Sequence, residues 1–268
     1  MSDWLPASAV ITGGASGIGL AVARELSERG VRVMLADLPG ASLDEAAAAL
    51  DGAVAHPCDV ADLAQVEALA DAAFAQFGSV ELLLNNAGVG GPQGKLWEID
   101  PADARAHFDI NYWGVWNGCK AFTPRMVEQD APSAIYNTAS ENSFFCAGPR
   151  MGTYIAAKHA VLGLTESFRE DLPAHVHAGV VIPGWVHTPI GPEQFMSLGM
   201  DSGEFAKIIV PQMLGRERFV VSHYSNFRRI RERIDPLLDS YERHASREQG
   251  DTAYDVRDVI DALRRQRD

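Results

Sequence analysis

A glycine-rich turn between an apolar run and a helical repeat most constrains how this chain can fold. Residues 9–11 are apolar, residues 12–19 hold the glycines, and Ile18, Val22 and Leu26 then recur at intervals of four. The pattern predicts a strand, a glycine loop and a helix. Glycines let the backbone turn tightly and approach a pyrophosphate, whose charge is favoured by the amides and dipole at the helix start. This order of elements is typical of a dinucleotide site.

A carboxylate follows the second predicted strand. Residues 31–36 form that strand and Asp37 ends it, 18 residues after Gly19. There a carboxylate can accept hydrogen bonds from an adenosine ribose, and it would repel a 2′-phosphate. Neither Ser16 nor Leu38 offers a positive charge to receive that phosphate. Asp37 therefore favours NAD over NADP. The alternative, a simple turn residue at a strand end, stays open at this point.

Strands and helices alternate along most of the chain. Further strands are expected at residues 53–55, 80–84, 134–138 and 178–182, with an edge strand at 219–221. Helices are expected at 44–50, at 62–77, at 100–129 with a kink at Pro124, around Tyr154, and in two charged stretches at 225–244 and 254–265. The alternation is lost between residues 189 and 219. Because no Pro/Ser/Gly-rich linker divides the chain, we expect one large α/β domain.

Tyr154 and Lys158 lie one helical turn apart, so they share a face of the predicted helix. A tyrosine in water has a pKa near ~10 and is a poor base at neutral pH, unless a cation stabilises the phenolate. A tyrosine tuned in this way can exchange a proton with an alcohol oxygen. Ser140 ends a strand and can converge on the same point. Asn111, a poor helix former inside the helix expected at 100–129, indicates a specific hydrogen bond.

The formal net charge of −13 argues against several classes of partner. It repels phosphate backbones and anionic lipid headgroups, so we expect a small-molecule substrate, no nucleic acid and no membrane surface. Cys58, Cys119 and Cys146 form neither a disulfide framework nor a metal-ligand spacing, and no signal segment precedes the first strand. The longest apolar runs fall short of the ~18 residues that a membrane span needs. We expect a cytoplasmic enzyme.

Taken together, these motifs resemble the short-chain dehydrogenase/reductase family over residues 7–221. The matching positions are residues 12–19, Asp37, Asp59 with Val60, residues 85–88, Asn111, Ser140, Tyr154 with Lys158, and Pro183 with Gly184 and Thr188. The resemblance implies an α/β fold with a single doubly wound Rossmann domain, in which a parallel seven-stranded sheet has helices on both faces. It also implies a homodimer or homotetramer.

The resemblance assigns roles to residues of this chain. Tyr154 would be the general acid/base, and Lys158 would lower its pKa and bind the nicotinamide ribose. Ser140 would position the substrate oxygen, and Asn111 would hold a water that relays protons to Lys158. The positions implied to contact NAD are Gly13, Ser16, Gly17, Ile18, Gly19, Asp37, Asp59, Val60, Asn86, Ala87, Gly88, Tyr154, Lys158, Pro183, Gly184, Val186 and Thr188. No metal is expected, because a proton and a hydride carry the chemistry.

The substrate side departs from the family pattern in one respect. The interval from Ser140 to Tyr154 is one residue longer than is common in the family, and Ser143 lies closer, so either serine could position the substrate. The residues expected to line the substrate site are Ser140, Phe144, Phe145, Met151, Tyr154, Trp185, Phe195 and Met196. They predict a bulky apolar or aromatic substrate. The alternative is that some of them pack as ordinary core.

A helical extension is expected to follow the α/β domain. Residues 1–224 would form the dehydrogenase domain, with a substrate flap at about 190–214, and residues 225–268 a helical C-terminal extension. Apolar residues of the extension recur at spacings of three and four, at Phe227, Ile230, Ile234, Leu237, Leu238 and Tyr241. Such a stripe would pack either on its own domain or on a neighbouring subunit.

The sequence therefore predicts an NAD-dependent oxidoreductase that interconverts a secondary alcohol and a ketone. Two alternatives remain. One is an NADP-dependent carbonyl reductase, and the other is a catalytically silent protein that binds or senses a dinucleotide.

Overall fold

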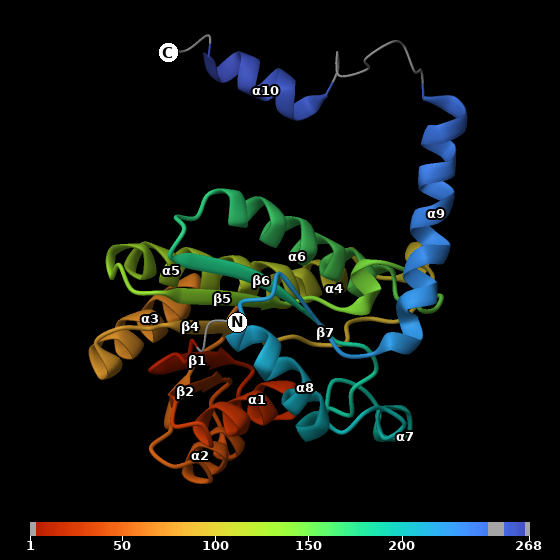
Figure 1. The fold of residues 1–268 in the computed structure, drawn as a ribbon. Helices are drawn as coiled ribbons and strands as arrows, with labels where there is room; N and C mark the ends of the chain where they lie inside the picture. The colour runs from red at the N-terminus through yellow and green to blue at the C-terminus, as the bar shows by residue number, and fades with distance from the viewer. Residues whose placement is uncertain (1–3, 246–254, 266–268) are drawn as a thin grey trace. The chain divides into compact units, whose positions relative to one another are not determined.

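Seven parallel strands form one sheet in the computed structural model, which describes residues 4–245 and 255–265 (Figure 1). The strands are β1 (Ser8–Thr12), β2 (Arg32–Asp37), β3 (Val54–Pro57), β4 (Leu82–Asn85), β5 (Ser133–Thr138), β6 (Val176–Ile182) and β7 (Phe219–Val221). Their order is β3-β2-β1-β4-β5-β6-β7. The chain therefore adds β2 and β3 on one side of β1 and then crosses to the other side, where β4 to β7 follow, so the strand order reverses between β1 and β4. Doubly wound sheets bind ligands at such a reversal. The predicted fold class is confirmed.

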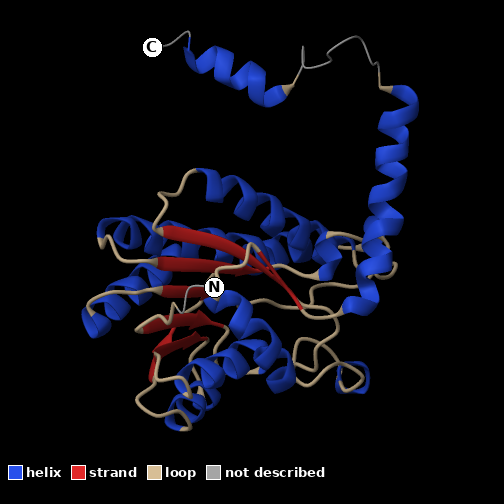
Figure 2. Ribbon diagram, in the orientation of Figure 1, coloured by secondary structure: helices blue, strands red, loops and turns tan. Residues whose placement is uncertain are grey.

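Helices cover both faces of the sheet (Figure 2). One face packs against α1 (Gly17–Ser27), α2 (Ala41–Ala48) and α8 (Ser202–Leu214), and the other against α3 (Leu63–Phe77), α5 (Gly114–Glu128) and α6 (Gly152–Glu170). The remaining helices of this unit are α4 (Pro101–Phe108) and the short α7 (Glu193–Met196), with single turns η1 (Leu96–Glu98), η2 (Asp109–Trp113), η3 (Glu141–Ser143) and η4 (Tyr224–Asn226).

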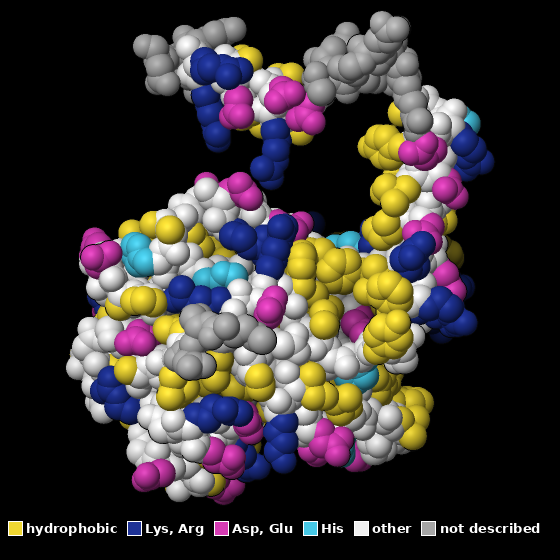
Figure 3. All heavy atoms as spheres, viewed as in Figure 1, with side chains coloured by type: hydrophobic (Ala, Val, Ile, Leu, Met, Phe, Trp, Pro, Cys, Tyr) yellow, Lys and Arg dark blue, Asp and Glu magenta, His cyan; other side chains and the backbone are white. Residues whose placement is uncertain are grey.

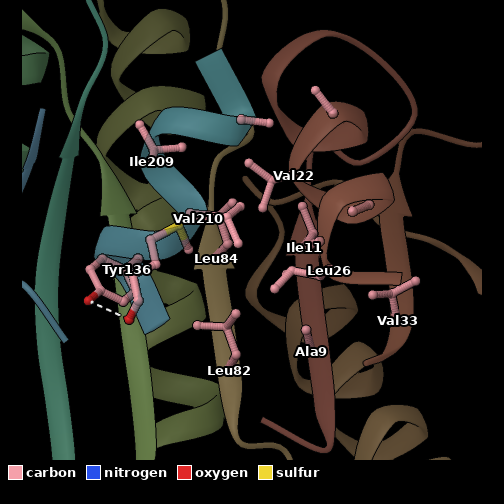
Figure 4. Packing of buried hydrophobic residues seen from close by; sticks show 14 of the residues in the cluster. Ala9, Ile11, Val22, Leu26, Val33, Leu82, Leu84, Tyr136, Ile209 and Val210 are labelled. Atoms are coloured by element: carbon pink, nitrogen blue, oxygen red, sulfur yellow. Dashed lines mark hydrogen bonds between the residues drawn. The ribbon is translucent and has the colours of Figure 1, made fainter. Parts of the chain in front are cut away.

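The apolar strands feed two separate cores because successive side chains point to opposite faces. On β1, Ala9 and Ile11 join the core beneath α1 and α8, whereas Val10 joins the core beneath α3 and α5. On β4, Leu82 and Leu84 lie in the first core and Leu83 in the second. Figure 4 shows the first of these cores. A parallel strand that is buried on both faces is nearly all apolar, as β4 is up to its last residue, Asn85.

Helix α8 occupies part of the stretch between residues 189 and 219, where strand and helix alternation was expected to be lost. Asp201 caps its first turn, since Oδ1 accepts hydrogen bonds from the amides of Gly203 and Glu204 at 2.8 and 3.0 Å. The side chains of Phe205 and Ile209, one turn apart, are fully buried in the core that α1 shares. Figure 4 labels Ile209 in this core. The second half of the expected flap is therefore a core helix.

The helix expected at residues 100–129 is also interrupted. It consists of α4, a π-helical turn at η2 and then α5, which contains Pro124. In the π-helical turn the amide of Gly114 bonds to the carbonyl of Asp109, five residues back. Such turns are rare and occur often at functional sites. This turn contains Asn111.

The chain divides into two compact units, residues 1–226 and 227–268. The second unit contains α9 (Phe227–His244) and α10 (Val256–Arg265). The expected start of the last helix at residue 254 lies outside the described residues. Neither helix has a buried residue in its described length, although Ile230 and Asp235 of α9 are half-buried.

Candidate active site

A cavity of about 640 Å³ opens at the carboxyl ends of the strands. Segments that directly follow β1, β2, β3, β4, β5 and β6 all contribute to its lining. From these segments come the predicted residues Gly13, Ser16, Ile18, Asp37, Asp59, Val60, Asn86, Ala87, Gly88, Ser140, Pro183, Gly184, Val186 and Thr188. Residues that are far apart in the sequence therefore line one cavity, which includes the point between β1 and β4 where the strand order reverses.

Three glycines of the first turn are required by close packing. Gly13 has a φ of +64°, and a Cβ there would lie 2.8 Å from the Cα of Ala87. A Cβ on Gly19 would lie 2.1 Å from the carbonyl oxygen of Gly13. Gly17 has a φ of +52° and lies against Thr188. Gly17 and Gly19 do not line the cavity themselves, but they allow the turn to form its wall.

Asp37 lies at the cavity with its carboxylate fixed by backbone amides. One oxygen accepts from Ala15 at 3.0 Å and the other from Leu38 at 2.8 Å. Since a carboxylate has about four acceptor sites, it can still receive hydroxyl donors. Among the described residues that line the cavity, none is a lysine or an arginine.

Asp59 and Val60, two of the positions implied to contact NAD, are also held in place. The carboxylate of Asp59 accepts from the amide of Ala61 at 2.9 Å, and the carbonyl of Val60 accepts from Asn117 Nδ2 at 2.9 Å. Both residues line the cavity. Their hydrogen bonds hold the wall that follows β3 in one conformation.

Lys158 is buried behind the cavity. Its Nζ donates to the carbonyl of Thr138 at 2.8 Å and lies 5.9 Å from the centre of the Tyr154 ring. Burial lowers the pKa of Lys158 from 10.5 to about 8, because the protein interior disfavours the charged form. Lys158 does not reach the cavity wall, whereas Tyr154 and Thr138 do.

The hydroxyl of Tyr154 meets Ser140 at the cavity. Burial raises the pKa of Tyr154, and its hydrogen bond with Ser140 partly offsets this shift. The expected lowering of this pKa by Lys158 does not appear, because desolvation dominates at this site. Further positive charge beside the phenol would be needed to bring its pKa down.

The two candidate serines have different partners. The hydroxyl of Ser143 donates to the backbone carbonyl of Lys158 at 2.6 Å, and its side chain is buried away from the cavity. Ser140 lines the cavity, and its hydroxyl accepts from the amide of Asn142 at 3.2 Å. The geometry favours Ser140 at the reacting oxygen and gives Ser143 the task of fixing α6.

Asn111 lies behind Gly88, fully buried. Its Oδ1 accepts from the amide of Val89 at 3.3 Å and its Nδ2 donates to the carbonyl of His107 at 3.1 Å. A Cβ on Gly88 would lie 2.8 Å from this oxygen and 3.7 Å from Lys158 Nζ. The π-helical turn thus places the amide of Asn111 close to the buried ammonium, although it does not line the cavity.

Sequence reasoning missed Glu141, which directly follows Ser140. This carboxyl group is buried, accepts a hydrogen bond from Asn226 Nδ2 and lies against Gly184. Burial raises its pKa. A carboxylate directly after a strand-end serine is the one signal that could have indicated it. Through the turn that it anchors, Glu141 helps to fix the position of Ser140.

The expected substrate residues separate into two groups. Met151, Trp185, Phe195 and Met196 line the cavity, together with Val89, Gln93, Asn142, Pro149, Ile190 and Pro192, which the sequence had not indicated. Phe144 and Phe145 do not line it. Phe144 packs in the core, with its ring 6.5 Å from that of Phe219 on β7. The lining of this cavity therefore gives no support to their assignment to the substrate site.

The described residues include no group of three His, Cys, Asp or Glu side chains that could hold a metal ion. Within residues 4–245 and 255–265, no helix has the length and apolar character needed to cross a membrane. The three cysteines are free, with Cys58 and Cys119 buried and Cys146 exposed.

Comparison with known proteins finds dehydrogenases in each case. The family model described as short chain dehydrogenase matches residues 7–197. The 1-deoxy-11-beta-hydroxypentalenate dehydrogenase of Streptomyces avermitilis is 36% identical over 91% of this chain and 93% of its own. The 2,5-dichloro-2,5-cyclohexadiene-1,4-diol dehydrogenase of Sphingobium indicum is 34% identical over 71% of this chain and 76% of its own.

A solved structure supports the same similarity. The crystal structure of a short chain dehydrogenase/reductase from Burkholderia phymatum in complex with NAD aligns with a TM-score of 0.83 and 30% identity. The alignment covers 92% of this chain and 99% of that one.

Proposed function

The chain belongs to the short-chain dehydrogenase/reductase family of oxidoreductases that act on CH–OH groups, and we propose that it uses NAD to interconvert a secondary alcohol and a ketone. The observation that carries this proposal is the convergence of Tyr154 and Ser140 in the lining of one cavity, with Lys158 buried behind them. A complete set of proton-handling groups argues against a catalytically silent relative.

The residues present fit a bound dinucleotide. The glycine turn is packed so closely that a Cβ at Gly13 or Gly19 would clash with backbone atoms. The first helix begins at Gly17, where free amides favour a pyrophosphate. Asp37 can accept the hydroxyls of the adenosine ribose, and the described lining offers no cation for a 2′-phosphate. These features support NAD rather than NADP. When bound, the nicotinamide supplies or accepts the hydride.

The protein's own residues handle the proton. In the oxidation direction, the oxygen of Tyr154 takes the proton of the substrate hydroxyl, and Ser140 donates a hydrogen bond that holds the substrate oxygen beside it. The ammonium of Lys158 lies close enough to favour the phenolate electrostatically once the positively charged form of the cofactor is beside it. The carbonyl of Thr138 fixes Lys158, and the amide of Asn111 lies near it behind Gly88.

We further propose a bulky apolar or aromatic substrate. Met151, Trp185, Phe195 and Met196 line the cavity, and Asn142 and Gln93 add polar side chains to the same region. The names of the two relatives above specify a hydroxypentalenate and a cyclohexadiene diol, both of which carry a hydroxyl group. Mostly apolar lining with a few placed polar groups is the usual make-up of a small-molecule site.

The proposed division of labour within the chain follows from the fold. Residues 1–224 would carry catalysis, and residues 225–268 would form an extension with another task. We limit the proposed flap to residues 190–200, because α8 is part of the core. A cytoplasmic location agrees with the three free cysteines. A homodimer or homotetramer is proposed for the assembly.

The direct test is a panel of aliphatic, aryl and polycyclic secondary alcohols, assayed separately with NAD and NADP by the absorbance of the reduced cofactor. Turnover of bulky alcohols with NAD is expected, with Tyr154→Phe as the inactive control. Preference for small polar polyols would disprove the substrate proposal. Comparable binding of NADPH and NADH in a fluorescence titration would disprove the cofactor assignment.

A further inference from the structure

Helix α9 has one apolar side that is exposed to solvent. Its apolar residues recur at spacings of three and four, and Leu237, Leu238 and Tyr241 are 53, 55 and 64% exposed. Figure 3 shows hydrophobic side chains gathered along one side of this helix. An apolar stripe of this length on a helix normally packs against another surface.

The charges beside this stripe are ordered along the helix. One flank carries Arg228, Arg231, Asp235, Asp239 and Glu242, so it begins basic and ends acidic. The ion pair between Arg231 and Asp235 at 2.9 Å confirms that these positions share a flank. The first turn holds Arg228 and Arg229 but no acid, which is the reverse of what the helix dipole favours. Ion pairs within the helix, such as Arg228 with Glu232 at 3.3 Å, offset part of this effect.

The arrangement matches a second copy of the same helix that runs in the opposite direction. Arg228 and Glu242 are each seven residues from Asp235, and Arg231 and Asp239 are each four residues from it. When two copies meet with Asp235 at the two-fold axis, each arginine faces an acid of the other copy, and the apolar stripes face one another. In a parallel pair the two copies of this flank would lie on opposite sides of the helix pair, so these charges would not meet.

We propose that α9 is an assembly surface that pairs antiparallel with α9 of a second copy of this chain. The balance of charge supports this partner over an anionic membrane, since five arginines on the helix are opposed by four acids. Every catalytic residue proposed above lies within residues 1–226. The pairing is therefore a separate property, and it can fail without affecting the proposed reaction.

Disulfide trapping in the full-length protein tests the contact. Cys146, the exposed cysteine, is first replaced by serine. Ile234→Cys lies on the stripe near the proposed axis, and Glu232→Cys lies on the opposite side as a matched control. We expect an intermolecular disulfide dimer from the first variant and little from the second. Equal trapping of both, or of neither, would overturn the proposal and point to the helix packing on its own catalytic unit or on another protein.

Charge exchange tests the orientation in the same Ile234→Cys background. The double variant R228E/R231E makes the flank acidic throughout, and D239R/E242R makes it basic at every position except Asp235. Each alone should cross-link about tenfold more slowly, because attractive pairs become repulsive. An equimolar mixture should recover the original rate as a heterodimer. Unchanged rates for the single preparations, or no recovery on mixing, would rule out antiparallel pairing. Turnover should stay unchanged in every variant, which verifies that the catalytic unit is folded.

Discussion

The two ends of the cavity are built in different ways. The end assigned to the cofactor is formed by residues that directly follow strands, such as Gly13 after β1, Asp37 at the end of β2 and Asn86 after β4. The end assigned to the substrate is formed by longer connections that carry Met151 and Phe195. A strand end is placed by the sheet, whereas a loop residue is placed by contacts with distant segments. The first end can therefore be inferred from motifs, and the second largely cannot.

The largest effect is expected from Tyr154→Phe, which should leave the cofactor end intact. Only the proton-transferring hydroxyl is removed, so kcat should fall by about 10²–10⁴-fold. The affinity for NADH, measured by fluorescence titration, should stay unchanged. If kcat and cofactor affinity fall together, the two ends of the cavity are not separable as proposed.

Lys158 is buried behind the cavity, and its charge should affect the free energy of unfolding. Its pKa falls from 10.5 in the unfolded chain to about 8 in the fold. Below pH 8 it is charged in both states, and the depression corresponds to a destabilisation on the order of 3 kcal/mol. Between pH 8 and 10.5 the unfolded chain binds more protons, so this contribution to the free energy of unfolding rises with pH.

The measurement for Lys158 is chemical denaturation of the cofactor-free protein from pH 7 to 10.5, compared with Lys158→Met. Burial raises the pKa of Cys58 to about 11 and that of Cys119 to about 12, so the thiols act in the opposite direction. The difference in the free energy of unfolding between the two proteins isolates the contribution of Lys158. The higher stability of the methionine variant should disappear as the pH rises. A difference that does not depend on pH would contradict a charged, buried Lys158.

Local patterns were sufficient for the sheet and for several positions at the cofactor end. Apolar runs predicted the strands, and the one-turn spacing of Tyr154 and Lys158 predicted a shared face. The π-helical turn was missed because it depends on bonds between Asn111 and both Val89 and His107, of which Val89 belongs to a distant loop. Contacts of this kind leave no periodic signal in the sequence. Helix α8 was missed for a different reason, since its apolar residues were interpreted as a flap.

Asp37 provides the test of the cofactor end itself. Replacing the carboxylate by Asp37→Asn keeps an acceptor for the amide of Ala15 and removes the charge. Affinity for NAD should fall by about 10-fold, because hydrogen bonds to a charged group contribute about 1.5–3 kcal/mol. Adding Leu38→Arg, at a position that is 60% exposed, should raise affinity for NADP through a charge-assisted bond to the 2′-phosphate. Binding of both cofactors by calorimetry checks this, and an unaltered preference would mean that Asp37 does not select the cofactor.

The smallest effects are expected from alanine substitutions at the substrate end, which distinguish residues that line the cavity from residues that pack in the core. Met151 lines the cavity, whereas Phe144 packs against Phe219 and the core. Met151→Ala should lower kcat/KM for bulky alcohols about tenfold relative to small ones, since lost apolar contacts cost about 1–3 kcal/mol in specificity. Phe144→Ala should leave that ratio unchanged and instead lower the melting temperature, because a partly buried ring leaves a cavity. The two variants together distinguish lining from core. The assignments would be contradicted if Phe144→Ala changed the substrate ratio while Met151→Ala did not. The loop after Ser140 would then have to contact substrate during turnover, in a conformation different from this one.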